Sequence, residues 1–281
     1  MATAATSPRP PPPPAPSARR SREPLYVGVG VAVAVVVLVV VFVAGPALTG
    51  SGAVGPILPY SGARPVADRT VAGFEGGGWS LLFAAGLVSS TAVTIPESTT
   101  ALSNLSCTFV PVSPHANLSV PAYAGNRSAG LAPAWEFGYG SLANGIALVS
   151  VIDGQGVVVG TLTGGECGAV SVLPSVPGTV IDSSRAAAAA EPYARAFLAA
   201  NPNASAAFGL GPAAFFGGSS LSFEWVVLYS TCSANGPASQ TGSEFNATVN
   251  ALTGAVLTTH TASGVSCESG TFTAVRSNGP S

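Results

Sequence analysis

The chain of 281 residues contains no lysine, so all ten of its basic residues are arginine. Charged residues make up 8% of the sequence, against about a quarter in a typical soluble domain. Without lysine, neither a phosphate-binding loop of the G-x-x-x-x-G-K type nor a Ser–Lys catalytic dyad can form. These two kinds of nucleotide-binding and hydrolytic site are therefore excluded.

Histidine is also scarce, with only His115 and His260 present. Neither has a cysteine or carboxylate nearby in sequence, as a metal site or an acid–base pair would need. The sequence has no C-x-x-C pair and no G-x-S-x-G elbow. We therefore expect no metal, no cofactor and no catalytic residue. Glu136 and Glu224, each flanked by aromatic residues, are either a ligand-binding pair of acids or outward-facing strand residues repeated by duplication. The second interpretation is favoured.

One long apolar run, residues 25–48, carries no charge. Twenty helical residues reach about 30 Å, the thickness of the hydrocarbon core of a bilayer. The run is therefore predicted to be a transmembrane helix in contact with lipid. Arg19, Arg20 and Arg22 precede it, which predicts a cytoplasmic N-terminus and an extracytoplasmic C-terminal domain. The protein is thus expected to be a single-pass signal-anchor protein of the cell membrane. A signal peptide cleaved after Ala53 is the alternative.

The arm before this run, residues 1–24, is rich in proline and arginine and is expected to be disordered and cytoplasmic. Four arginines and one glutamate give it a charge of +3, whereas six arginines and eleven acids give the rest of the chain −5. An acidic region without lysine lacks the basic stripe that binds nucleic acid. Small residues four apart in the apolar run would allow homodimerisation, unless they only reflect its composition. These pairs are Gly28 with Ala32 and Gly30 with Ala34.

The cysteines and the glycosylation signals all lie beyond the apolar run. An even number of cysteines in an exported domain favours disulfides. The four are Cys107, Cys167, Cys232 and Cys267. Five N-x-S/T sequons predict a glycoprotein, unless they are chance products of a region rich in serine and threonine. The candidate sites are Asn104, Asn117, Asn126, Asn203 and Asn246.

Two segments of the exported region resemble each other. After a linker at 49–62, the pattern P-x-A-x-x-x-[VL]-A begins at Pro65 and again at Pro192. Each copy predicts a helix with proline in its first turn, followed by three strands. In the second copy, Ala186–Ala190 is expected to extend the helix backwards.

The turns at Asp153-Gly154 and at Ala251–Gly254 separate apolar or β-branched runs and predict hairpins. The predicted fold is α+β: an N-terminal single transmembrane helix followed by an ectodomain of two helix-plus-antiparallel-meander repeats. The repeats span 63–172, which includes a long loop insertion, and 173–281.

The meander geometry also favours one disulfide pairing. In the second repeat, the first and third strands run parallel, two strand positions apart, so their ends lie about 10 Å apart. The few residues that follow the third strand can close this gap. Cys232–Cys267 is therefore favoured, which leaves Cys107–Cys167, although sequence alone permits three connectivities.

Residues 249–257 read V-N-A-L-T-G-A-V-L and follow an alanine-rich helix and a Phe/Trp strand. This pattern resembles the PepSY-type module, whose hairpin typically reads V-D-A-x-T-G-x-V, over residues 192–267. A fainter echo covers 63–167. Asn250 replaces the usual acid, and the insertion that contains Cys232 is unusual. The resemblance implies an extracytoplasmic binding or inhibitory module, often associated with the control of secreted peptidases, and it brings no catalytic residues.

The leading functional hypothesis is a membrane-anchored, extracytoplasmic, non-enzymatic binding or inhibitory module. Its partner would be an envelope or secreted protein, and it would need a groove or an exposed strand edge with apolar character. A glycosylated structural component of the cell surface is the alternative, and this would carry sequons on all faces. A hydrolase is the third hypothesis, and it would need His260 within hydrogen-bonding reach of a serine or an acid.

Overall fold

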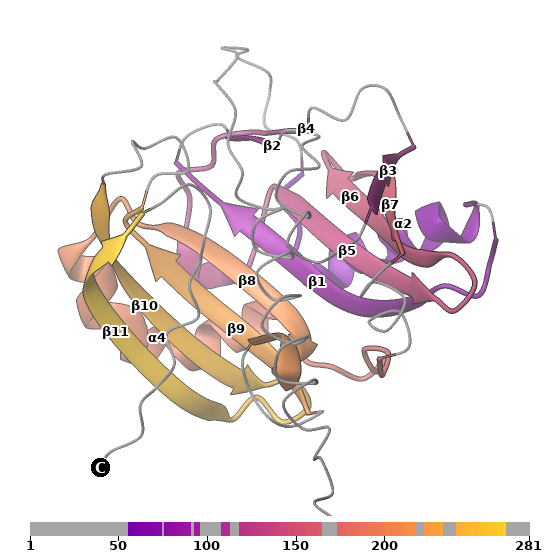
Figure 1. The fold of residues 1–281 in the computed structure, drawn as a ribbon. Helices are drawn as coiled ribbons and strands as arrows, with labels where there is room; N and C mark the ends of the chain where they lie inside the picture. Colours follow the sequence, from indigo (N-terminus) through magenta and orange to yellow (C-terminus); the bar gives the residue numbers. More distant parts are fainter. Residues whose placement is uncertain are drawn as a thin grey trace, which may run out of the picture.

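The structure is a computed structural model that describes residues 56–74, 76–90, 93–95, 108–112, 118–164, 173–216, 222–232 and 240–267. Its main feature is a sheet of nine antiparallel strands (Figure 1). In order across the sheet these are β11 (Val256–Ser266), β10 (Thr241–Asn250), β9 (Phe223–Ser230), β8 (Ser205–Pro212), β1 (Ser80–Val88), β5 (Ala134–Ser141), β6 (Gly145–Ile152), β7 (Gln155–Thr163) and β3 (Thr108–Pro111). A separate small sheet pairs β2 (Val93–Ile95) with β4 (Leu118–Val120).

The described helices are few. They are α2 (Tyr60–Ala72), α4 (Ser183–Ala200) and the short 3-10 helices η2 (Arg127–Ala129) and η3 (Ala213–Phe216). Helix α2 begins before the position expected from Pro65, whereas α4 includes Ala186–Ala190 as predicted, and Pro65 and Pro192 both lie inside their helices. Both prolines are exposed, as are Ser61 and Ala188 four residues earlier. The carbonyl that each proline leaves without an intrahelical donor is therefore near water, which makes the proline tolerable.

The predicted α+β fold with two separate meander repeats is wrong in its architecture. The two halves form one continuous sheet because β1 pairs with β8, for example Gly86 opposite Phe208. Each half contributes a helix and four successive sheet strands rather than three, and β3 extends the first half. The unexpected strand is β8, whose alanine- and glycine-rich sequence lacks the β-branched residues that indicate strands.

The prediction of a single-pass membrane protein is also corrected. Among the described residues, no helix is long and apolar enough to cross a membrane. Of the two α-helices, α2 carries Arg64, Asp68 and Arg69, and α4 carries Arg185, Glu191 and Arg195. The predicted span at 25–48, with its dimerisation pairs, lies outside the described residues. The structure therefore gives the single-pass topology and the cell-membrane localisation no support.

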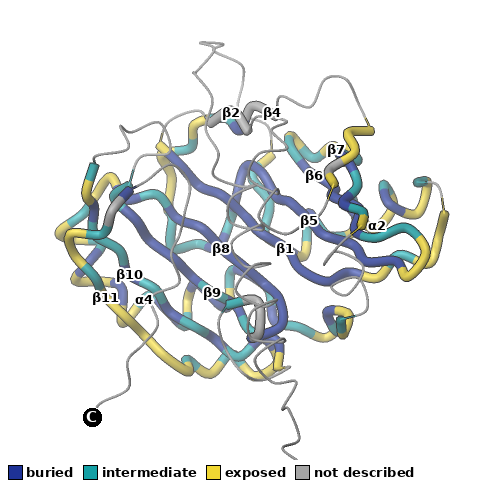
Figure 2. The backbone as a smooth tube through the Cα atoms, in the orientation of Figure 1, coloured by how far each residue is buried: buried dark blue, intermediate teal, exposed yellow. Residues whose placement is uncertain are grey.

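Both α-helices cover the same face of the sheet, and one hydrophobic core fills the space between (Figures 1 and 2). Helix α2 packs on β5, β6 and β7, and α4 packs on β9, β10 and β11. The buried side of α4 is made largely of alanine, including Ala186, Ala190 and Ala194. Small side chains let the helix approach the sheet closely. The large aromatic residues of the strands fill the core between the helices and the sheet.

Matched tryptophans mark the duplication in this core. The indole N–H of Trp135 donates to the carbonyl of Leu58, just before α2, at 2.8 Å. That of Trp225 donates to the carbonyl of Ile181, just before α4, at 3.0 Å. The two rings meet edge to face with centroids 6.4 Å apart. An added Cβ at Gly86 would lie 2.9 Å from the Trp135 ring, so glycine makes room for this ring.

The N-termini of the two helices are tied together. The Asp182 carboxylate, at the N-cap position of α4, accepts from the backbone N–H of Ser61 in α2 at 2.8 Å. The Ser183 hydroxyl accepts from the N–H of Tyr60 at 2.9 Å and donates to the carbonyl of Gly130 at 2.6 Å. A carboxylate close to helix N-termini is favoured by the positive end of the helix dipole. These contacts join the two halves behind the sheet.

The opposite face of the sheet is buried over the first half. Every residue of β5 and all but the first residue of β1 are buried. Phe83 lies over Gly138, where an added Cβ would come within 2.1 Å of its ring. Val120 of β4 is fully buried. Strands enclosed on both faces read as almost continuous apolar runs, as β1 and β6 do.

Candidate functional site

The sheet ends in β11, which is its longest strand, with 11 residues. In the described sheet β11 pairs only with β10, so one row of its backbone groups has no sheet partner. Residues 257–261 are exposed, and the strand contains neither proline nor a charged residue. Such an edge is a template for another extended chain. The candidate site is therefore this edge, which we call the β11 edge (residues 256–266).

Apolar side chains accompany the β11 edge at its start. Leu257 is 47% exposed, and Leu252, in the turn before the strand, is 52% exposed. The turn is well ordered by local hydrogen bonds, because the Asn250 side chain accepts from the N–H groups of Leu252 and Thr253 at 3.0 and 2.9 Å. Gly254 has a φ of 80°, which favours glycine. Two leucines are thus held at the surface beside unpaired strand backbone.

The opposite end of the sheet differs. Strand β3 has only four residues and ends in Pro111. Short edge strands and edge prolines are devices that protect a sheet against further pairing. The β11 edge has neither device, and its pairing with β10 is regular from Thr258 to Ser263, between bulges at Leu257 and Gly264.

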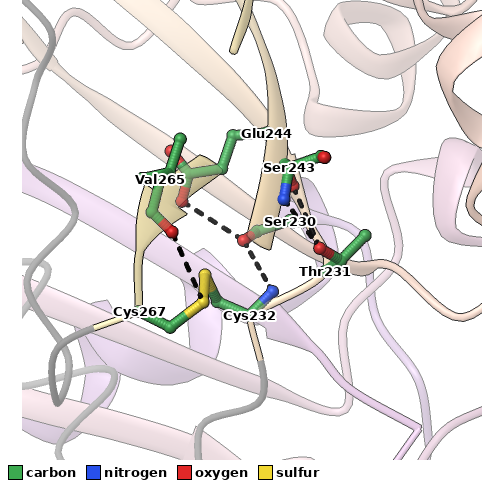
Figure 3. The surroundings of a disulfide bond; sticks show 7 residues. All are labelled: Ser230, Thr231, Cys232, Ser243, Glu244, Val265 and Cys267. Atoms are coloured by element: carbon green, nitrogen blue, oxygen red, sulfur yellow. Dashed lines mark hydrogen bonds between the residues drawn. A yellow bond between two sulfur atoms is a disulfide. The ribbon is translucent and has the colours of Figure 1, made fainter. Parts of the chain in front are cut away.

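A disulfide fixes the end of β11. Cys232 and Cys267 are joined with their Cα atoms 5.3 Å apart, which is the pairing that the meander geometry favours. Cys232 follows β9 and Cys267 follows β11, so the bond reaches across β10 (Figure 3). Gly242 of β10 lies beneath the bond, where an added Cβ would come within 2.7 Å of the Cys232 sulfur. The other predicted cysteines, Cys107 and Cys167, lie outside the described residues.

Hydrogen bonds around the disulfide hold β9 and β10 together (Figure 3). The Thr231 hydroxyl accepts from the N–H of Ser243 at 2.8 Å, and the Thr231 N–H donates to the Ser243 carbonyl at 3.0 Å. The Ser230 hydroxyl donates to the Glu244 carboxylate at 3.2 Å. Burial raises the pKa of Glu244. These hydrogen bonds and the disulfide therefore connect β9, β10 and β11 at the C-terminal end of the β11 edge.

His260 lies in the middle of β11, exposed, and opposite Asn246 of β10. Within the described part of the chain, no hydrogen bond or ion pair joins it to a serine or an acid. His115 lies outside that part. Sets of three or more His, Cys, Asp or Glu side chains that could hold a metal are absent from the described residues.

The described sequons fall into two environments. Asn126 and Asn203 are exposed, and their segments are neighbours because the Arg127 guanidinium donates to the Pro202 carbonyl. Asn246 is half-buried, and its side-chain oxygen is covered and has no hydrogen-bond partner. Asn246 is therefore less accessible to a glycan than Asn126 and Asn203. Asn104 and Asn117 lie outside the described residues.

The two glutamates that the sequence pairs are not structurally equivalent. Glu136 follows its tryptophan, whereas Glu224 precedes the corresponding one, so the two occupy different rows of the same outer face. Glu224 is half-buried and accepts from the Ser222 hydroxyl at 3.2 Å. Glu136 is only 5% exposed, and its Oε1 atom has no partner. Burial raises the pKa of Glu136 to about 8.

Sequence reasoning placed Glu136 outward on a solvated face. The available signal was the composition of the neighbouring strands, since β1 (SLLFAAGLV) and β6 (GIALVSVI) are apolar on both faces. A strand between two such neighbours is enclosed on both sides. Glu136 should therefore have been expected to be buried.

The described fold belongs to the class of large antiparallel sheets with helices on one face. Comparison with family models, curated proteins and solved structures finds no match to this chain. The resemblance to the PepSY-type module therefore remains a hypothesis.

Proposed function

We propose that this protein is a non-enzymatic binding protein that captures an extended segment of a partner protein by adding it as a strand to β11. The observation that carries this proposal is the contrast between the two ends of the sheet. β11 is long, exposed, uncharged and free of proline, whereas β3 is short and ends in proline. In strand addition, backbone hydrogen bonds provide affinity and alternate side chains provide specificity.

The rigidity of this edge supports the same function. Binding costs less free energy when the binding surface is already ordered. The disulfide, the Thr231–Ser243 hydrogen bonds and the Asn250-capped turn order both ends of β11 before any partner arrives. Exposed Leu252 and Leu257 offer the partner an apolar contact beside the backbone.

The structural alternative, a surface component covered by glycans, predicts sequons over all faces. The two exposed described sequons, at Asn126 and Asn203, instead lie in neighbouring segments. A disulfide at this edge is consistent with a protein that functions in an oxidising compartment. We favour partner capture over surface coverage because of the exposed β11 edge.

Two neighbouring proline substitutions test strand addition. In an edge strand, successive N–H groups point alternately toward the sheet and away from it. Thr259→Pro and His260→Pro thus remove one inward and one outward N–H. We expect one variant to lose about 1 kcal/mol or more of stability. The other should keep its stability but lose binding of extended peptides selected from a random displayed library on the wild-type protein.

Amide hydrogen exchange of the peptide complex locates the bound segment, and protection is expected along β11. Phe109→Pro, at the β3 edge, is the matched control, because the Val112 N–H faces β7 and alternation places that of Phe109 on the outer side; it should leave peptide binding unchanged. Peptides that protect another surface, or that bind both proline variants as tightly as the wild type, would contradict the proposal. Failure to select any peptide that protects β11 would also contradict it.

A further inference from the structure

The outer face of the first half of the sheet contains a small pocket around Glu136. It is lined by Ala85, Leu87, Val120, Ala134, Trp135, Glu136, Ser150 and Ile152. Its walls are therefore apolar except for the Glu136 carboxyl and Ser150, which lies opposite Glu136 in the sheet register. The volume open to the centre of a water molecule is about 10 Å³, close to the minimum that one water needs. The pocket thus accepts a polar group of about the size of water.

One oxygen of the carboxyl in this pocket has no hydrogen-bond partner among the described residues. This oxygen, Oε1, is buried and accepts no hydrogen bond. The strands that line the pocket, β1, β4, β5 and β6, contain no basic residue, and Glu136 is their only acidic one. A buried polar group without a partner costs free energy. A ligand that donates hydrogen bonds and carries a positive charge would supply both the donor that Oε1 lacks and the basic group that the lining strands lack.

We propose that the Glu136 pocket binds the ammonium group of a small aliphatic amine, with the Glu136 carboxylate as its counter-charge. An ammonium group is about as large as a water molecule and carries donors but no acceptor, so it matches both the space and the unpartnered oxygen. The alkyl chain would leave the pocket past Ile152. Ile152 is half-buried, so the lining reaches the surface at that side chain.

Binding of an ammonium group requires ionisation of the carboxyl. With a pKa of about 8, about one Glu136 side chain in ten is ionised at pH 7. When the ligand binds at pH 7, the O–H bond of the remaining carboxyl groups breaks and the proton passes to the buffer. The ammonium nitrogen keeps its three hydrogens. Binding should thus release about 0.9 proton per ligand at pH 7 and almost none well above pH 8.

Calorimetry with n-butylammonium tests this site on the full chain, with n-butanol as the uncharged comparison. Titrations at pH 7 in two buffers of different ionisation enthalpy count the protons released, and a titration at pH 9.5 should show almost none. We expect Glu136→Gln to weaken butylammonium binding at least tenfold and to leave any weak butanol binding unchanged. Glu224→Gln is the matched control on the same face of the sheet and should bind butylammonium as the wild type does.

Several results would overturn the proposal. These are no butylammonium binding, butanol binding of equal affinity, no proton release at pH 7, or unchanged affinity in Glu136→Gln. The proton count is made on the wild type, so it decides the question even if the variant folds poorly. The proposal is independent of strand addition at β11, because neither experiment uses the other's site.

Discussion

Glu136 shows how neighbours across a sheet determine the state of one side chain. Its own strand reads A-W-E-F, with large aromatic residues on the helix face and the glutamate on the other. A solvated face would leave this carboxyl ionised. Here the second apolar layer, which includes Val120, excludes water, and the pKa rises to about 8 because burial disfavours the charged form.

The raised pKa of Glu136 predicts a pH-dependent stability. Below about pH 4.5 the carboxyl is protonated in both folded and unfolded states. Between about pH 4.5 and 8 the unfolded chain loses this proton and the folded protein keeps it, so stability falls as the pH rises. Glu136→Gln should remove this loss, which amounts at pH 8 and above to at most about 5 kcal/mol. Urea unfolding at several pH values measures the difference.

The comparison between variant and wild type at pH 4 provides the control, because the two should then be similar in stability. Burial also raises the pKa of Glu224 and of Glu244. The free energy of unfolding of the variant should therefore still decrease as the pH rises, but less steeply than that of the wild type. A variant whose free energy of unfolding follows the wild-type pH profile would show that Glu136 is not buried in its neutral form.

Among the elements, the hairpins were the most predictable from sequence. Asp153-Gly154 forms the predicted tight turn between β6 and β7, with φ values of 55° and 72°, as a type I′ turn requires. The turn before β11 was predicted for similar reasons. Strand β8, SAAFGLGP, gave no such signal. Gly209 leaves room for the Phe216 ring, which an added Cβ would approach to 3.2 Å, and this is tertiary information that a local pattern does not contain.

The disulfide that fixes β11 predicts a measurable loss when it is removed. The bond closes a loop of 35 residues, and the chain-entropy model assigns such a loop about 3 to 4 kcal/mol. The double variant Cys232→Ala/Cys267→Ala should lose about this much free energy of unfolding in denaturant titrations. Its β11 amides should also exchange hydrogen faster than the same amides of the wild type, whereas those of β8 should change less. An unchanged free energy would show that the edge does not depend on the bond.

For the whole molecule, the β1–β8 pairing is the feature that sequence could not supply. The repeat pattern predicts a helix and a set of strands in each half of the chain, but edge-to-edge pairing between the halves leaves no local signature. It becomes visible only in the register of Ala84 with Leu210 and Gly86 with Phe208. The edge that forms the candidate site follows from this arrangement, because pairing of β1 with β8 leaves β11 at the end.

The shared core predicts that both halves unfold together. One hydrophobic cluster contains residues of both α-helices and both halves of the sheet, including Trp135 and Trp225. Thermal unfolding followed by circular dichroism and by tryptophan fluorescence should give a single coincident transition.

Trp225→Phe and Trp135→Phe make this test specific to each half. Each variant loses one indole hydrogen bond. Because Trp79 also lies in the first half, Trp225→Phe fluoresces from the first half alone, and Trp135→Phe is combined with Trp79→Phe to leave only the fluorescence of the second half. Both should be destabilised, and each should still give one transition by both methods. Two separate transitions would show that the halves are independent domains.

The protected β3 end has a consequence for stoichiometry. A sheet that accepted strands at both ends would allow each protein to bind two partner segments, and a partner with several such segments could link many proteins. Here Pro111 and the short length of β3 close one end, so each protein offers one edge, at β11, to a partner segment. The complex is therefore expected to contain one partner segment per protein and to have a defined mass that does not grow with concentration.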